Sequence, residues 1–238
     1  MSFENRTVAI IGGGSGFGFR VATRIIAAGG HVVLGGRSEA RLLDAVARLG
    51  PRARAQTVDI EQKASIAAFF EVIERVDHLF VPAATYKVGP IDTLSDADAE
   101  SPFRTKFWGQ YHAIKAALPR FAPDGSIVLM AGAAGARPIK GAAAYAAANS
   151  AIEGLGRALA LELAPIRVNT VSPGTIDGDL WRSRPDSVRE PAFALYSQLA
   201  ALGRPGTEDE VADTVLFLMQ NSYMTGSTLY PDGGYALR

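Results

Sequence analysis

The stretch Gly12-Gly13-Gly14-Ser15-Gly16-Phe17-Gly18 connects the apolar run 7–11 to a helical pattern over 16–28. Glycines here allow positive φ angles and close backbone approach, so the N–H groups that begin the helix can reach a pyrophosphate. The spacing is Gly-x-x-x-Gly-x-Gly rather than Gly-x-Gly-x-x-Gly, because Phe17 occupies the last glycine position of the second frame. The alternative is a turn that only packs a helix against a strand. We predict a dinucleotide-binding turn made of Gly12, Gly14, Ser15, Gly16, Phe17 and Gly18.

Short apolar runs alternate with longer helical patterns along the whole chain. The expected strands are 7–11, 31–34, 53–58, 77–81, 126–130, 167–171 and 227–230. The expected helices are 16–28, 38–49, 62–75, 96–118, 144–163 and 208–219. Apolar strands separated by helices indicate a parallel sheet that is covered on both faces. We predict an α/β fold in which residues 1–238 form a single doubly wound Rossmann-type domain with about seven parallel strands.

Segment 174–206 is the one stretch without a regular pattern, and it is rich in proline, arginine and aromatic residues. We expect an irregular loop at the carboxyl edge of the sheet, where it would serve as a substrate lid. The aromatic and aliphatic side chains of Trp181, Phe193, Leu195 and Tyr196 could wall an apolar pocket, or they could pack only against one another.

The composition excludes several classes of function. Lysine plus arginine and aspartate plus glutamate both number 24, so we expect no nucleic-acid partner and no membrane partner. The absence of cysteine excludes disulfides and thiolate metal sites, and the three histidines lack metal-ligand spacing, so we expect no metal. No apolar stretch is long enough to span a bilayer, and a strand begins too early for a signal peptide, so we expect a cytoplasmic protein.

The end of the second expected strand predicts which dinucleotide is bound. A site that prefers NAD has an acidic residue there, which holds the ribose 2′-hydroxyl. This chain has glycine at that position, followed by Arg37 and Ser38. A planar guanidinium suits a 2′-phosphate, and a serine hydroxyl adds a hydrogen bond. The pattern favours NADP(H), whereas the alternative is a solvated arginine at the start of a helix.

Further motifs occur in the order and spacing of one family. Val58-Asp59-Ile60 follows the third strand, Ser172-Pro173-Gly174-Thr175-Ile176 follows the sixth, and Asp232-Gly233-Gly234 lies near the end. Together with the glycine turn, these motifs resemble the short-chain dehydrogenase/reductases over residues 5–235.

The resemblance implies that Asp59 binds the adenine amino group and that Pro173 and Gly174 pack against the nicotinamide. It also implies backbone contacts from Thr175 and Ile176 to the carboxamide. The expected cofactor site further includes Ile60, Ala83, Ala84, Tyr145 and Asn149. A homodimer or homotetramer built through helix 141–163 and the helix that carries Lys106 is implied as well.

The expected catalytic residues depart from the family pattern. That family uses a tyrosine, a lysine four residues later, a serine thirteen residues earlier and an asparagine on the preceding helix. Tyr145 is kept, but the serine position is Gly132, the lysine position is Asn149, and the asparagine position is Lys106. Our hypothesis is that lysine and asparagine have exchanged places, so that Lys106 supplies the ammonium beside Tyr145. The alternative is drift in a protein that has lost hydride transfer.

Three functions therefore remain in view. The first is an NADP(H)-dependent oxidoreductase that acts on a small, partly apolar carbonyl or alcohol, with Tyr145 as proton donor or acceptor. The second is a catalytically silent NADP(H)-binding sensor or partner subunit, because Gly132 and Asn149 replace two central groups. The third, a cofactor-free lyase, ranks lowest because the glycine turn is intact.

Overall fold

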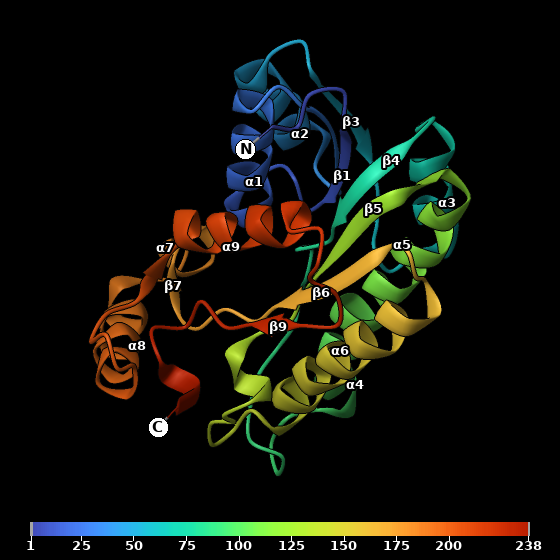
Figure 1. The fold of residues 1–238 in the computed structure, drawn as a ribbon. Coiled ribbons are helices and arrows are strands. Elements are labelled where there is room, and N and C mark those ends of the chain that lie inside the picture. The colour runs from blue at the N-terminus through green and yellow to red at the C-terminus, as the bar shows by residue number, and fades with distance from the viewer. Residues whose placement is uncertain (1, 238) are drawn as a thin grey trace.

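The computed structural model describes residues 2–237 and contains one seven-stranded sheet in the order β3-β2-β1-β4-β5-β6-β9 (Figure 1). All neighbouring strands in this sheet are parallel. The strands are β1 (Thr7–Ile11), β2 (His31–Gly36), β3 (Ala53–Thr57), β4 (Val76–Phe80), β5 (Phe121–Met130), β6 (Arg167–Val171) and β9 (Thr228–Leu229). The order reverses between β1 and β4, and ligands bind at such a switch point in doubly wound sheets. The predicted Rossmann-type fold is confirmed.

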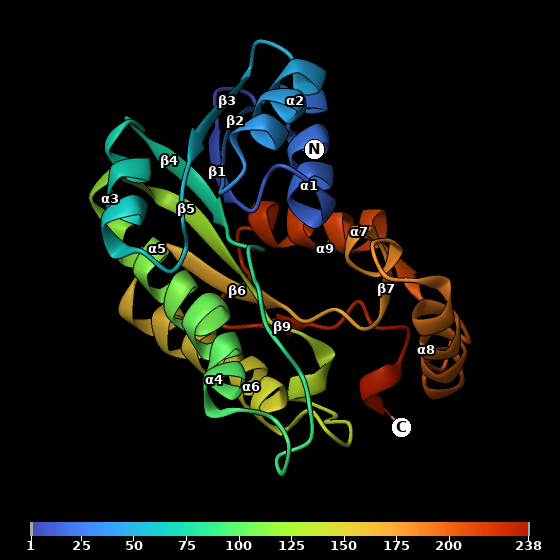
Figure 2. The same cartoon turned by 180° about the vertical axis from the view of Figure 1, so that it is seen from behind.

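Helices cover both faces of the sheet. The helices are α1 (Gly16–Ala27), α2 (Glu39–Leu49), α3 (Lys63–Glu71), α4 (Asp96–Pro102), α5 (Gly109–Ala117), α6 (Ala143–Glu162) and α9 (Glu208–Gln220). Figures 1 and 2 show α1, α2 and α9 on one side of the sheet and α3, α5 and α6 on the other. Among the described residues, no helix is both long and apolar enough to span a membrane.

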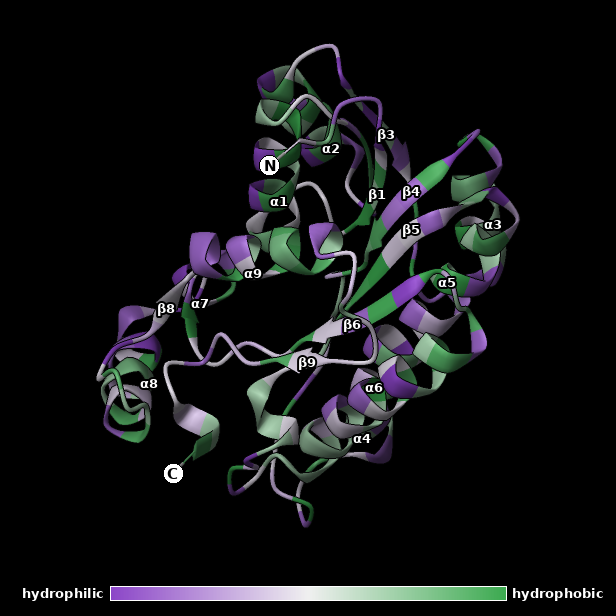
Figure 3. Ribbon diagram, in the orientation of Figure 1, coloured by the Kyte–Doolittle hydropathy of each residue, from purple (hydrophilic) through white to green (hydrophobic). Residues whose placement is uncertain are grey.

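The alternation of side chains along β1 creates two cores. Val8 and Ile10 pack toward α1 and α9, whereas Ala9 and Ile11 pack toward α3 and α5. All four are buried, because successive side chains of a strand point to opposite faces and helices cover both faces. Apolar residues accordingly concentrate along the central strands in Figure 3.

The predicted helix over 96–118 is not a single α-helix. A π-helical segment, Phe103–Trp108, separates α4 from α5, and Pro102 immediately precedes it. Proline has no N–H to donate and its ring disturbs the preceding turn, so a change of helical geometry at this point is expected. The π-helical segment carries Lys106 and directs its side chain into the protein interior, where it is 4% exposed.

The expectation that segment 174–206 is irregular is wrong. It contains a short parallel pair, β7 (Ile176–Asp177) with β8 (Gly206–Thr207), and two helices, α7 (Asp179–Arg182) and α8 (Asp186–Leu199). Helix α8 contains Pro191 and has no fully buried residue. The segment lies beyond the carboxyl ends of the main strands (Figure 1).

Candidate active site

The glycine turn is compact because three of its positions leave no room for a side chain. Gly12 has a φ of 104°, and a Cβ there would lie 2.7 Å from the Ala83 nitrogen. A Cβ on Gly18 would collide with the Gly12 carbonyl oxygen, and one on Gly13 would lie 2.7 Å from the Leu34 side chain. The first turn of α1 therefore packs directly against the end of β1, and its N–H groups lie at the edge of the sheet.

We expect Gly18→Ala to damage both stability and cofactor binding. The added methyl must push α1 away from Gly12, because its nearest neighbours are backbone atoms that cannot rotate away. Overpacking of this kind costs about 1–3 kcal/mol in the free energy of unfolding. Urea unfolding and calorimetric titration with NADPH would measure the two losses. Gly154→Ala on α6 is the control, because a Cβ on that glycine meets only the end of the Arg157 side chain, at 3.9 Å. A Gly18→Ala variant no less stable than this control would contradict the packing argument.

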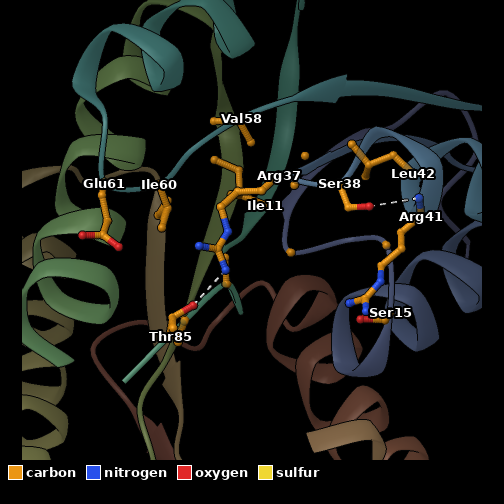
Figure 4. A pocket seen from close by; sticks show the side chains of 16 residues that line it. Ile11, Ser15, Arg37, Ser38, Arg41, Leu42, Val58, Ile60, Glu61 and Thr85 are labelled. Carbon is orange, nitrogen blue, oxygen red and sulfur yellow. Dashed lines mark hydrogen bonds between the residues drawn. The ribbon is translucent and has the colours of Figure 1, made fainter. Parts of the chain in front are cut away.

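A cavity of about 360 Å³ opens above this turn (Figure 4). Eight of the predicted cofactor-binding residues line it, namely Gly12, Gly14, Ser15, Arg37, Ser38, Ile60, Ala83 and Ala84. Gly16, Phe17 and Gly18 form the adjoining start of α1. Asp59 is not among the lining residues, and its Oδ1 accepts the Glu61 N–H at 3.0 Å.

Two guanidinium groups border the cavity. Arg37 Nη2 donates to Thr85 Oγ1 at 3.1 Å, and Arg41 lies near Ser15 on the other side (Figure 4). The predicted Ser38 is the N-cap of α2, where its hydroxyl accepts the Arg41 N–H. Glu61 is the only carboxylate among the lining residues, and it forms an ion pair with Arg104 at 3.5 Å. The rim of the cavity therefore suits a phosphate group.

The structure brings the three predicted catalytic residues together. Lys106 Nζ donates to Asn149 Oδ1 at 2.6 Å and to the Ala131 carbonyl oxygen at 3.0 Å. Asn149, which is fully buried on α6, donates through Nδ2 to the Tyr145 carbonyl oxygen at 2.8 Å. Lys106 Nζ lies 5.1 Å from the centroid of the Tyr145 ring. The positions that differ from the family pattern are thus hydrogen-bonded to each other beside the tyrosine.

Burial dominates the electrostatics of this group. It lowers the pKa of Lys106 to about 7, because a charged amine is poorly solvated there. Within residues 2–237, no carboxylate forms an ion pair with Lys106. Burial also raises the pKa of Tyr145 well above its usual value, and the neighbouring Tyr86 raises it further. Tyr145 therefore holds its proton in this state of the site.

Gly132 lies against the hydroxyl of Tyr145. A Cβ built on Gly132 would be 3.2 Å from Tyr145 Oη and 3.3 Å from Asn149 Oδ1. The end of β5 thus approaches the phenol closely, and position 132 contributes no hydroxyl to the site. Sequence reasoning missed Tyr86, whose ring stacks on Tyr145 with centroids 4.5 Å apart and planes 24° apart.

The remaining predicted cofactor-binding residues follow β6, outside the 360 Å³ cavity. The Pro173 carbonyl oxygen accepts the Ala133 N–H at 2.8 Å, and Gly174 packs against Asp232. Thr175 leads into β7, which begins with Ile176. These residues lie at the carboxyl end of β6, the strand next to β5.

Segment 174–206 contacts the glycine turn directly. Asp179 Oδ2 accepts the Gly16 N–H at 3.0 Å, and Glu208 Oε1 accepts the Asp179 N–H at 2.9 Å. Within this segment, the Trp181 ring packs against Phe193 and Tyr196, with centroids 5.6 and 6.3 Å away. The segment is therefore held both by its own aromatic packing and by the start of α1.

A doubly wound sheet with a glycine turn beneath a cavity is the arrangement of a nucleotide-binding fold, and here a half-buried tyrosine lies beside a buried lysine. Comparison with known proteins leads to the same class of protein. The family model described as enoyl-(acyl carrier protein) reductase matches residues 12–236. The chain is 34% identical to sorbose reductase sou1 of Schizosaccharomyces pombe, over 100% of this chain and 98% of that protein. The chain belongs to the short-chain dehydrogenase/reductase family and is an oxidoreductase.

Two solved structures are similar over nearly their whole length. A small-chain dehydrogenase in complex with NADPH has a TM-score of 0.85 and 29% identity, covering 99% of this chain and 100% of that one. An NADPH-bound short-chain oxidoreductase of Pseudomonas aeruginosa PAO1, described as containing an atypical catalytic center, has a TM-score of 0.90 and 26% identity. It covers 98% of this chain and is itself covered to 97%. Members of this family bind a nicotinamide cofactor and typically act on small molecules.

Proposed function

We propose that this chain is an NADP(H)-dependent oxidoreductase that interconverts a carbonyl compound and an alcohol, with Tyr145 as the proton donor and acceptor. The observation that carries the proposal is the buried Lys106 amine, which is hydrogen-bonded to Asn149 and lies over the Tyr145 ring. The lysine lost at position 149 is thereby replaced from the neighbouring helical segment. The relative with an atypical catalytic center and bound NADPH supports the same reading.

The residues of the chain have separate tasks in this reaction. When bound, NADPH supplies the hydride to the carbonyl carbon. Tyr145 gives its phenolic proton to the carbonyl oxygen, so that an alcohol forms. The ammonium of Lys106 stabilises the phenolate that remains, because an opposite charge nearby favours the ionised form. The Asn149 side chain accepts a hydrogen bond from the Lys106 amine and donates one to the Tyr145 carbonyl oxygen, so it holds the amine in place beside the tyrosine.

NADP(H) is the cofactor that the cavity supports. Arg37 and Arg41 border it from two sides, and a guanidinium pairs well with a 2′-phosphate. Gly12, Gly16 and Gly18 give the backbone its close approach to a pyrophosphate. Residues 174–206 would close over the substrate, and the aromatic side chains of Trp181, Phe193 and Tyr196 favour a partly apolar one. We further propose a single domain over 1–238 that assembles as a homodimer or homotetramer through α6 and the helical segment that carries Lys106.

Turnover is tested by mixing the purified protein and NADPH with a panel of ketones, aldehydes and quinones. We expect loss of NADPH absorbance with at least one compound. Tight NADPH binding without turnover of any compound would contradict the proposal. It would favour the silent sensor or partner subunit, which the replacement of the serine by Gly132 also motivates.

We expect Arg37→Ala and Arg41→Ala each to weaken NADPH binding by about tenfold to a hundredfold, since each removes a charge-assisted hydrogen bond. Binding of NADH, which lacks the 2′-phosphate, should change by less than about threefold. Calorimetric titration of both cofactors measures the difference. Arg54→Ala, on the neighbouring strand β3 but outside the cavity, is the control. Equal losses for NADPH and NADH would argue against recognition of a 2′-phosphate.

A further inference from the structure

Tyr86 forms a face-to-face pair with the proposed proton donor. Its ring lies 4.5 Å from the Tyr145 ring between centroids, at 24° between planes. Lys106 Nζ faces both rings, at 5.1 Å from the Tyr145 centroid and 5.6 Å from the Tyr86 centroid. The two phenols therefore share one environment and one nearby amine.

Hydrogen bonds on both sides hold Tyr86 in this place. Thr105 Oγ1 donates to the Thr85 carbonyl oxygen at 2.7 Å and accepts the Thr85 N–H at 3.3 Å. The Lys87 N–H donates to Ser101 Oγ at 2.9 Å. Thr105 lies on the π-helical segment that carries Lys106, and Ser101 lies on α4, which directly precedes that segment. Tyr86 is thus fixed relative to the lysine, although it lies on the connection after β4.

Tyr86 is close enough to affect the ionisation of Tyr145. The two stacked rings lie 4.5 Å apart between centroids, and the charge and hydrogen bonding of Tyr86 add to burial in raising the pKa of Tyr145. Tyr86 is half-buried, so its ring covers Tyr145 while part of the side chain is still open to an incoming molecule.

Beside this pair, a hydrogen-bond donor is missing. The site reduces or forms a carbonyl under the proposed function, and negative charge develops on the carbonyl oxygen during the reaction. Removing one donor to such an oxygen typically costs about a hundredfold to a thousandfold in rate. Gly132 has no hydroxyl, and Tyr145 Oη lies 3.2 Å from where its Cβ would be.

We propose that the Tyr86 hydroxyl donates a hydrogen bond to the carbonyl oxygen of the substrate and replaces the donor that position 132 lacks. This inference rests on the proposed function. Tyr145 transfers its phenolic proton to the carbonyl oxygen, and Tyr86 only donates a hydrogen bond to that oxygen. The alcohol therefore gains one hydride on carbon from the cofactor and one proton on oxygen from Tyr145. The stacked ring holds the second phenol beside the first.

The test compares Tyr86→Phe with the wild type, using NADPH and the carbonyl compound turned over fastest in the panel. Phenylalanine keeps the stacked ring and removes only the hydroxyl. We expect kcat to fall by about tenfold to a hundredfold, while the Kd for NADPH and the melting temperature stay unchanged. Tyr223→Phe is the matched control, because Tyr223 is 98% exposed and should show no loss.

A second variant separates hydrogen bonding from packing. Gly132→Ser, introduced into Tyr86→Phe, restores a hydroxyl next to Tyr145 and should recover part of the lost kcat. Wild-type turnover in Tyr86→Phe would overturn this inference and leave the proposed function standing. A loss that comes with a lower melting temperature and is not recovered by Gly132→Ser would also overturn it. If the wild type oxidises NADPH with no compound, the proposed function fails first and this inference falls with it.

Discussion

Replacing Lys106 by methionine should lower kcat for NADPH oxidation by about a hundredfold or more, the range in which a positioned acid–base group contributes. Lys106 is the only amine facing the Tyr145 ring among the cation–ring contacts of residues 2–237. Without its charge, the phenolate left after proton transfer is unstabilised in a buried site. The Kd for NADPH should change by less than about threefold, because Lys106 does not line the cavity of the glycine turn.

The same experiment includes a variant that reverses the exchange. Lys106→Asn and Asn149→Lys should each lose activity when made alone, because each breaks the hydrogen bond between positions 106 and 149. The double variant places lysine and asparagine as the family pattern has them, and it should recover activity relative to both single variants. Lys115→Met is the control, because Lys115 is exposed on α5. Full activity in Lys106→Met would show that the two residues have merely drifted.

Turnover should also depend on pH through Lys106. Burial holds the pKa of this amine at about 7, so its ammonium form predominates below that pH and disappears above it. We expect the rate of carbonyl reduction to fall as pH rises through about 7, and the residual rate of Lys106→Met to lack this fall. A wild-type rate that is flat between pH 6 and about 9 would mean that the charge of Lys106 is not used.

Sequence reasoning predicted the order of strands and helices because each has a strong local signal. The runs at β1 and β2 are short and mostly apolar, and the glycine turn after β1 has positions where a side chain would collide with neighbouring atoms. Helix α8 was missed because Pro191 lies within its sequence, and proline is unfavourable inside a helix. The π-helical segment was also missed, because its geometry depends on packing around Pro102 and Lys106.

Sequence reasoning predicted those site residues that stand at a motif position of the family pattern. Lys106 and Asn149 could be paired as a hypothesis because each stands at the position of the other in the family pattern, and the structure joins them by a 2.6 Å hydrogen bond. Arg41 and Tyr86 had no such signal. Arg41 lines the cavity because it lies in the first turn of α2, which packs beside the glycine turn. Tyr86 stacks on Tyr145 because the connection after β4 folds back toward α6.

The burial of Lys106 leads to a second large effect, this time on stability. In the unfolded chain its pKa has the ordinary value of 10.5, and in the folded protein it is about 7. Below pH 7 the amine is charged in both states, so the folded state bears the full penalty for burying the charge. Between pH 7 and 10.5 the unfolded state binds the additional proton, and stability therefore rises with pH. The contribution is a little over 1 kcal/mol for each pH unit in this window, or roughly 5 kcal/mol in total.

Lys106→Met has no proton to bind at this position, so it should be the more stable protein at pH 6 and should lose this advantage as pH rises. Urea unfolding of both proteins at several pH values from about 6 to 9 gives the difference in the free energy of unfolding, in which groups such as His78 cancel. A difference that does not vary with pH would show that Asn149 Oδ1 and the Ala131 carbonyl keep the ammonium charged in the fold. In that case the kinetic fall above pH 7 should be absent too, because both effects arise from the same proton on Lys106.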